Sequence, residues 1–359
     1  MRIFFVLDYL SGRGGVETVV STVVKSLEEK GHSIYVFLPK QSEDTRWEKN
    51  LNNVYYYSQN ESGTGSGLEV ISERSIGLAM LIHELELPDV VVATHTPHTA
   101  LYSRVALGYN KHIPLVSWLH NPPERFHNYE FINYADIHWA ISKGIKEKLK
   151  GIVLNAQEIY WIGNPLNLEV PQLQIDSSQH YVFIGRLENK QKRLDILFKA
   201  LANLKHRWSL DIYGSGPDEE MLHNLALELG IHESINMKGW VENPWKDIRN
   251  ITSLVLTSDF EGFGLVVGEA LSRGVPVIST DSEGPKDMII NGSNGWIVPV
   301  GDITELTKTF ERIASLSSRD LHQISIQALK SVQNFSIDQV LNRIKYSLSN
   351  YIPNERWNF

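Results

Sequence analysis

The feature that most constrains the fold is an alternation of short apolar runs, glycine-rich turns and helical segments. Residues 2–8 form an apolar run of strand length, which is followed by the turn SGRGG at 11–15 and by a segment with apolar residues at helical spacing. Gly31 supplies the end of this helix, and a second apolar run covers 32–38. This strand–turn–helix–strand order is the opening of a doubly wound parallel sheet.

The second half of the chain repeats this order. Apolar runs predict further strands at 180–185, 209–217, 235–240, 251–258, 275–280 and 295–300. A chain of 359 residues is long enough for about two domains. We therefore expect an α/β protein with two doubly wound parallel-sheet domains, 1–170 and 171–340, separated in a polar stretch that contains Pro171. The tail predicts further helices, and a last helix over 341–359 can pack back on the first domain.

The composition is ordinary for a globular protein and excludes several classes of function. There is no cysteine, so a disulfide framework and a thiolate metal site are excluded. The net charge of −8 is shared equally by the two halves, which argues against a nucleic-acid partner. Neither a signal peptide nor a run of about 18 apolar residues is present, so we expect a cytoplasmic protein. The 13 histidines show no HExxH-type spacing, and no metal site is expected.

The stretch 260–280 carries the clearest functional pattern. It predicts a tight glycine turn, an amphipathic helix and a buried strand in succession. Glu261 lies on the turn, and Glu269 follows eight positions later on the helix. The backbone N–H groups from Phe263 to Leu265 would lie at the start of that helix, where an anion such as phosphate is favoured. The pattern predicts a nucleotide-diphosphate site in which a carboxylate can bind a sugar diol.

Further candidates follow the carboxyl ends of predicted strands, where ligands bind in open α/β sheets. Arg186 and Lys192 follow the strand at 180–185, and two cations there would offset the charge on a diphosphate leaving group. The alternative is ordinary surface pairing with Glu188. His120 ends an earlier strand, where it either takes part in chemistry or caps a neighbouring backbone group.

Three other features leave their alternatives open. Gly14 and Gly15 either contact a ligand or only allow the following helix to pack closely. The polar segment 55–68 is either a linker or a lid over an acceptor. Residues 144–151 (GIKEKLKG) are the one local candidate for a basic face, and a solvated helix end is the simpler interpretation.

Several motifs, taken together and in chain order, resemble the retaining glycosyltransferases of family 4. The most specific is a pair of glutamates separated by seven residues, Glu261 and Glu269, inside EGFGLVVGEA. The others are SGRGGVETV, NPL at Asn164, GRL at Gly185 and YGSGP at Tyr213. Within the family, the motifs SWLH, YADIHWAISKGIKE, QKR, GWVENPW and GPKDMI look most like the lipopolysaccharide 1,6-galactosyltransferases. The match covers nearly the whole chain and implies the GT-B fold, in which two Rossmann-like domains face each other across a cleft.

The resemblance implies a donor that is a nucleotide sugar, usually UDP-linked, and gives a role to each matching residue. In the second domain, Arg186 and Lys192 would bind the diphosphate, Glu269 would bind the ribose, and Gly214 would contribute its glycine turn. Trp240 and Val241 would contact the uracil. The backbone N–H groups of Phe263, Gly264 and Leu265 would point toward the sugar and the phosphates. In the first domain they are Gly14 and Gly15 near the β-phosphate and Asn164 in the motif NPL. The catalytic candidates are Glu261, which would contact the transferred sugar, and His120, which would lie near the reacting carbon.

The activity implied by the resemblance is metal-independent transfer of a hexose, galactose or glucose, from a UDP-sugar to a hydroxyl of a growing cell-surface glycan or glycolipid. No cofactor is expected, and peripheral contact with the inner face of the cytoplasmic membrane is implied by such an acceptor. One alternative keeps the fold but uses another donor, such as UDP-N-acetylglucosamine, on an exopolysaccharide, wall polymer or protein-linked glycan. Another is a nucleotide-sugar-binding protein without catalysis. The chain departs from the family at the pair Gly284-Pro285 and at Asp287, where Gly-Gly and Glu are commoner, which leaves open which sugar hydroxyls are recognised there.

Overall fold

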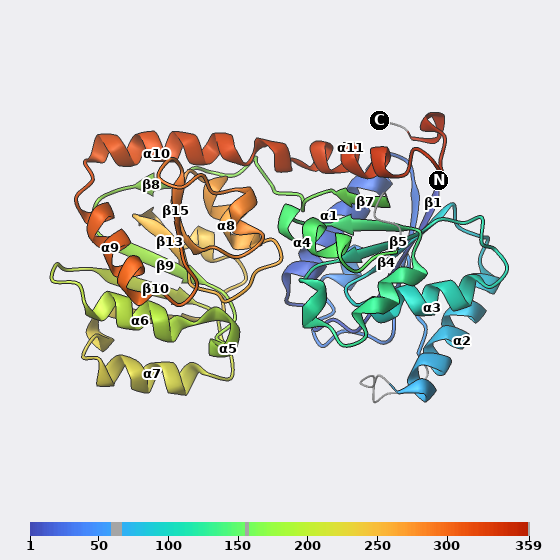
Figure 1. Cartoon of the computed structure of the whole chain (residues 1–359), viewed down its shortest axis with the longest axis horizontal. Coiled ribbons are helices and arrows are strands. Elements are labelled where there is room, and N and C mark those ends of the chain that lie inside the picture. Colours follow the sequence, from blue (N-terminus) through green and yellow to red (C-terminus); the bar gives the residue numbers. More distant parts are fainter. Residues whose placement is uncertain (59–66, 155–157, 358–359) are drawn as a thin grey trace. The chain divides into compact units, whose positions relative to one another are not determined.

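The computed structural model describes residues 1–58, 67–154 and 158–357. The chain divides into two compact units (Figure 1). The first contains Met1–Pro165 and Ile337–Phe359, and the second contains Leu166–Ser336. Each unit is an α/β domain with a parallel central sheet, as the alternation of apolar runs and helical segments predicts.

The first unit is built on a seven-stranded parallel sheet in the order β3-β2-β1-β4-β5-β6-β7. Its strands are β1 (Arg2–Leu7), β2 (Ser33–Leu38), β3 (Val54–Tyr56), β4 (Val90–Thr94), β5 (Leu115–Leu119), β6 (Ile137–Ala140) and β7 (Ile159–Trp161). Its α-helices are α1 (Gly15–Glu29), α2 (Leu68–Glu84), α3 (Pro97–Leu107), α4 (Lys143–Lys150) and α11 (Ile337–Ser347). Every residue of β4 and β5 is buried, as expected for parallel strands covered on both faces.

Aromatic and aliphatic side chains fill the core beside the central strands of the first unit. Phe4 and Phe37 lie on neighbouring strands with ring centroids 4.9 Å apart, and Val91 and Leu115 belong to the same buried cluster. Burial of a side chain such as Phe4 stabilises the fold by roughly 1.5–3 kcal/mol. This packing gives a rigid support to the residues that follow β4 and β5.

Helix α11 belongs to the first unit, although it lies at the end of the chain. It packs against α1 and β7, as can be followed in Figure 1, and Trp139 Nε1 donates a hydrogen bond to Ser347 Oγ at 2.8 Å. The sequence predicts a last helix over 341–359. The helix instead begins at Ile337 and ends at Ser347, and Pro353 prevents it from continuing through the rest of that segment.

The second unit contains a six-stranded parallel sheet in the order β11-β10-β9-β13-β14-β15 and a small two-stranded sheet of β8 and β12. Its strands are β8 (Gln174–Ile175), β9 (His180–Ile184), β10 (Ser209–Tyr213), β11 (Ile235–Gly239), β12 (Asn250–Ile251), β13 (Ser253–Leu256), β14 (Val277–Thr280) and β15 (Gly295–Val298). Its α-helices are α5 (Asn189–Lys192), α6 (Leu194–Ala202), α7 (Glu219–Glu228), α8 (Leu265–Leu271), α9 (Ile303–Ala314) and α10 (Ser318–Ser331).

The chain passes from one unit to the other after Pro165 and again after Ser336. The residues of the second unit at these two points are hydrogen-bonded to each other. Leu166 N donates to Phe335 O at 2.8 Å, and Leu166 forms a β-bridge with Ser336. The division therefore falls between Pro165 and Leu166, a few residues before the boundary predicted near 170.

Candidate active site

The predicted donor-binding residues of the second unit gather at the carboxyl end of its sheet. Arg186 follows β9, Gly214 follows β10, Trp240 follows β11, and Glu261 lies in the loop between β13 and α8. Lys192 is the last residue of the short helix α5, which also follows β9. Because parallel strands point the same way, their carboxyl ends meet at one edge of the sheet, which is where ligands bind in folds of this type.

An ion pair joins Lys192 to Glu261 at this edge. Lys192 Nζ lies 2.6 Å from Glu261 Oε1, and the two side chains are only 16% and 12% exposed. Ser258 Oγ donates to the same carboxylate oxygen at 2.8 Å. Two further hydrogen bonds join these segments: the Thr257 hydroxyl donates to Lys192 O at 2.9 Å, and the backbone Asp259 N donates to Gln191 O at 2.8 Å. A cation and a carboxylate are thus held side by side. The cation can bind a negatively charged group of a ligand, and the carboxylate can accept hydrogen bonds from its hydroxyl groups.

Glu269 is held by a tryptophan that the sequence analysis did not single out. Trp245 Nε1 donates to Glu269 Oε2 at 2.8 Å. The guanidinium of Arg273 lies 4.8 Å from the centre of the Trp245 ring and donates from Nη1 to Glu269 O at 2.8 Å. Trp245 closes the motif GWVENPW, so an aromatic residue shortly after a predicted strand was the available signal.

The turn before α8 packs against Gly284 without room for a side chain. Gly264 has a φ of +75°, which favours glycine, and Leu265 then begins the helix. A Cβ atom on Gly284 would lie 2.2 Å from Phe263 Cα, and Gly284 N donates to Glu261 O at 3.1 Å. Gly284, which precedes the position where this chain has Pro285, therefore supports the turn that carries Glu261.

The other predicted positions of the second unit differ in exposure. The side chain of Arg186 is 71% exposed, and its Nε lies 3.8 Å from Glu188 Oε2, so the pairing considered as an alternative exists but is loose. Trp240 is 45% exposed, and Val241 follows it. Gly214 is required by packing, because a Cβ there would lie 1.9 Å from Gly185 O.

In the first unit, His120 follows β5 and is only 7% exposed. Its Nε2 lies 3.0 Å from Thr94 Oγ1. Burial, together with the nearby His95, lowers the pKa of His120 to about 3, so the ring is neutral at neutral pH. His95 follows β4 with a φ of +81°, which is rare for a residue with a side chain and marks a constrained position at this sheet edge.

The glycine turn at the start of α1 encloses a buried carboxylate. Gly12 N donates to Glu17 Oε1 at 2.8 Å, and a Cβ on Gly14 would lie 2.6 Å from Glu17 Oε2. Gly14 therefore has a packing reason to be glycine, and the contact of Gly14 and Gly15 with a ligand stays a prediction. Asn164, after β7, is 2% exposed, and its Oδ1 has no hydrogen-bond partner within the described parts of the chain.

Residues 59–66, most of the segment 55–68 predicted to be a linker or a lid over an acceptor, lie outside the described residues. Its start is anchored, since Tyr57 is buried and its hydroxyl donates to Leu7 O at 2.6 Å. The choice between a linker and a lid stays open.

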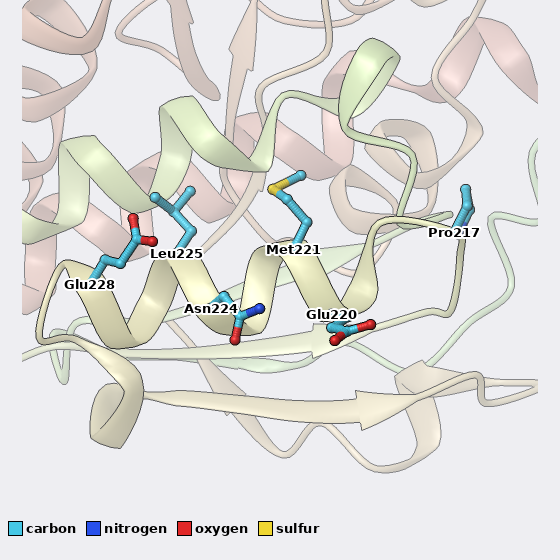
Figure 2. Close-up of a pocket in the computed structure, with 6 residues that line it drawn as sticks. All are labelled: Pro217, Glu220, Met221, Asn224, Leu225 and Glu228. Atoms are coloured by element: carbon cyan, nitrogen blue, oxygen red, sulfur yellow. The ribbon is translucent and has the colours of Figure 1, made fainter.

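A shallow hollow of about 490 Å³ lies along α7, away from the predicted site residues. Its lining residues are Pro217, Glu220, Met221, Asn224, Leu225 and Glu228. Figure 2 shows these side chains along the single helix α7 and the turn before it, with Met221 and Leu225 pointing to the same side. Glu220 and Glu228 would repel a diphosphate. The hollow therefore does not fit the charged part of a nucleotide sugar.

Comparisons with known proteins agree with the motifs. The profile of "Glycosyltransferase Family 4" matches residues 13–170, and that of "Glycosyl transferases group 1" matches residues 169–330. A lipopolysaccharide 1,6-galactosyltransferase of Salmonella typhimurium is 32% identical over 337 residues, which cover 90% of this chain and 92% of that protein. The enzyme of the same name from Escherichia coli is 30% identical over 84% of this chain and 86% of its own length.

Solved structures show the same architecture. The lipopolysaccharide outer core galactosyltransferase WaaB in its apo form has a TM-score of 0.86 and 30% identity, covering 98% of this chain and 100% of its own. The Anabaena protein HepE in complex with UDP has a TM-score of 0.82 at 20% identity, with 98% and 100% coverage, and supports the fold alone. These similarities confirm the resemblance drawn from the motifs and the GT-B fold that it implies. The chain therefore belongs to glycosyltransferase family 4 and is a glycosyltransferase of the GT-B fold.

Proposed function

We propose that this enzyme transfers galactose from UDP-galactose to a hydroxyl of a lipopolysaccharide acceptor, with retention of the anomeric configuration. The observation that carries the proposal is the ion pair between Lys192 and Glu261 at the carboxyl end of the second unit's main sheet. Glu269 follows eight residues after Glu261. The similarity of this chain, over most of its length, to two lipopolysaccharide 1,6-galactosyltransferases supports this choice of donor and acceptor.

The second unit binds the nucleotide in this proposal. Arg186 and Lys192 contact the diphosphate, where two cations offset the charge that builds up as the bond to the sugar breaks. Glu269 accepts hydrogen bonds from the ribose hydroxyls, in an orientation that Trp245 maintains. Other contacts come from Trp240 and Val241 at the uracil, from Gly214, and from the backbone N–H groups of Phe263, Gly264 and Leu265.

The family resemblance gives residues of each unit a role toward the sugar and its phosphate. Glu261 and His120 contact the sugar, Gly14 and Gly15 approach the β-phosphate, and Asn164 supports the same site. The bond between the anomeric carbon and the phosphate oxygen breaks as the acceptor oxygen bonds to the same face of that carbon. The proton of the acceptor hydroxyl passes to an oxygen of the departing phosphate. No covalent intermediate on Glu261 is required.

A calorimetric binding panel tests this function. UDP and UDP-galactose are expected to bind, UDP-galactose more tightly than UDP-glucose or UDP-N-acetylglucosamine, and GDP-sugars are expected not to bind. Preference for UDP-N-acetylglucosamine would replace the proposed donor by the alternative one. Binding without UDP release in the presence of lipopolysaccharide acceptors would indicate a nucleotide-sugar-binding protein instead.

We expect transfer to proceed without a divalent metal ion. In the proposed site, Arg186 and Lys192 supply the positive charge that a metal ion supplies to nucleotide substrates elsewhere. The rate of UDP release should be the same with EDTA as with added Mg²⁺. A loss of turnover on chelation that Mg²⁺ restores would contradict this expectation.

The substitution Gly284→Ala is expected to weaken UDP binding and to lower the stability of the second unit by about 1–3 kcal/mol. Its methyl group would clash with the Phe263 backbone and displace the turn that carries Glu261. Calorimetry with UDP and thermal unfolding measure the two effects. Gly67→Ala is the control, because Gly67 has a φ of −71° and open space around its Cβ position. Unchanged UDP affinity in Gly284→Ala would contradict the assigned turn.

The parts of the chain that the structure describes contain no helix that is both long and apolar enough to cross a bilayer. We propose peripheral contact with the inner face of the cytoplasmic membrane, because a lipopolysaccharide acceptor carries acyl chains. The basic helix α4 is the local candidate surface, although Lys148 pairs with Glu124 and Lys150 with Glu147. Weak sedimentation with anionic vesicles that high salt abolishes is expected. Equal sedimentation with neutral vesicles would exclude a charge-based contact.

A further inference from the structure

The hydroxyl of Thr94 lies between the ring of His120 and a backbone carbonyl. Thr94 ends β4, and His120 follows the neighbouring strand β5. Thr94 Oγ1 is 2.9 Å from Trp118 O and 3.0 Å from His120 Nε2. Thr94 is 0% exposed and His120 only 7%, so both contacts are shielded from water.

The number of protons fixes the direction of both hydrogen bonds. A carbonyl oxygen only accepts, so the contact with Trp118 O is a hydrogen bond only when Thr94 donates its proton there. A hydroxyl has one proton, and the contact with His120 must then be donated by Nε2–H. The opposite arrangement would leave two oxygen atoms facing each other at 2.9 Å without a proton between them, in a buried site.

The protonation state of His120 completes this assignment. Burial and the neighbouring His95 keep the pKa of His120 at about 3, so the ring carries a single proton at neutral pH. When that proton is on Nε2, Nδ1 has a free lone pair and can only accept a hydrogen bond.

We propose that Thr94 is a positioning residue that holds His120 as the Nε2–H tautomer, so that Nδ1 accepts a hydrogen bond from a hydroxyl of the donor sugar. The inference rests on the proposed function, in which His120 contacts that sugar. It excludes His120 as a proton donor to the leaving phosphate. It also makes one sugar hydroxyl a requirement, because a bound donor that lacks it covers the Nδ1 lone pair without supplying a hydrogen bond.

The tautomer can be measured without any substrate. ¹⁵N-histidine labelling distinguishes Nε2–H from Nδ1–H rings, and the His120 signals are those missing from His120→Asn. The wild type is expected to show Nε2–H at His120, and Thr94→Val is expected to shift the ring toward Nδ1–H. An Nδ1–H ring in the wild type would overturn the proposal. Because no donor is present, this result does not depend on whether the proposed sugar is correct.

Kinetics test the consequence for the reaction. Thr94→Val is expected to lower kcat/KM for the donor by about tenfold to a hundredfold, the loss associated with one buried hydrogen bond. Thr94→Ser should restore it, since serine supplies the same hydroxyl. Thr99→Val is the control, because Thr99 is equally buried and, among the described residues, its hydroxyl donates to backbone oxygen rather than to a side chain, with Thr96 O at 2.6 Å and Thr94 O at 3.2 Å sharing the one proton.

Donor analogues in which each sugar hydroxyl is replaced in turn by hydrogen separate recognition from general damage. The wild type should discriminate strongly against one of them, and Thr94→Val should lose that discrimination. Undiminished kcat/KM in Thr94→Val, or discrimination that stays unchanged, would overturn the role of Thr94. If the valine variant does not fold, the wild-type tautomer and the activity of Thr94→Ser still decide the matter.

Discussion

Replacing Glu261 with glutamine is expected to lower the rate of sugar transfer by about a hundredfold to a thousandfold and, at the same time, to strengthen the binding of UDP. The loss of rate follows from the loss of a charge placed next to the reacting sugar, which typically has an effect of this size. Glutamine keeps the shape of the side chain, so the loss would not be due to a cavity.

The gain in UDP affinity follows from the ion pair. Without a ligand, Lys192 is neutralised by Glu261 at 2.6 Å. A diphosphate must displace that carboxylate and is also repelled by it, so removing its charge should tighten UDP binding by roughly tenfold. Lys192→Ala should instead weaken UDP binding, because it removes the cation itself.

Calorimetry with UDP and a UDP-release assay measure both effects. Asp259→Asn is a matched control, since it removes a nearby carboxylate that pairs with Arg193 and not with Lys192. Weaker or unchanged UDP binding in Glu261→Gln would show that the pair does not compete with the diphosphate. Full transfer activity in the same variant would show that Glu261 does not take part in the reaction.

Acidification from pH 7 to pH 5 is expected to destabilise the first unit by several kcal/mol. Three of its histidines are buried and neutral: burial is the main cause that lowers the pKa of His32 to about 4, that of His120 to about 3 and that of His138 to about 4. In an unfolded chain these rings titrate near 6.5. Between pH 6.5 and 4 the unfolded state therefore binds more protons, and the free energy of unfolding falls as the pH falls.

Each such histidine contributes up to about 1.4 kcal/mol per pH unit in this range. The second unit behaves differently at His180, whose pKa is raised mainly by its hydrogen bond to Asp211. The stability that His180 supplies is complete below pH 6.5 and is lost as the pH rises through its raised pKa. We therefore expect the acid-induced loss to be concentrated in the first unit.

Urea unfolding at several pH values, followed by hydrogen exchange of peptides from each unit, measures this difference. His138→Asn should reduce the pH dependence of the first unit by about 1.4 kcal/mol per pH unit near pH 5. His223→Asn, which removes an exposed histidine from α7, should not change it. A pH dependence that stays the same in His138→Asn would show that His138 is not held neutral.

The alternation of strands and helices was readable from the sequence because both periodicities are local. The Glu261–Glu269 spacing was readable for the same reason, since both residues lie on one turn and helix. The extent of the last helix was readable in part: Pro353 shows that a helix cannot run through 341–359, whereas nothing between Ser347 and Pro353 marks its end at Ser347. The boundary near 170 was placed by polarity, whereas Leu166 is anchored by a hydrogen bond to Phe335, far along the chain.

The partners of the site residues could not be predicted, because they come from distant segments. Lys192 meets Glu261 from a segment 69 residues earlier, and Trp245 reaches Glu269 from another loop, 24 residues earlier. Thr94 contacts His120 only because β4 and β5 are neighbours in the sheet. A motif identifies the residue that touches a ligand, whereas the residues that orient it are found only when the strands are paired.

The most direct test of the proposed activity is to incubate the enzyme with UDP-galactose and a lipopolysaccharide core that lacks galactose, and to analyse the product by mass spectrometry and NMR. We predict the addition of one hexose in α-linkage, with the anomeric configuration of the donor retained and with one UDP released for each sugar added. A β-linked product, or transfer from another nucleotide sugar but not from UDP-galactose, would contradict it.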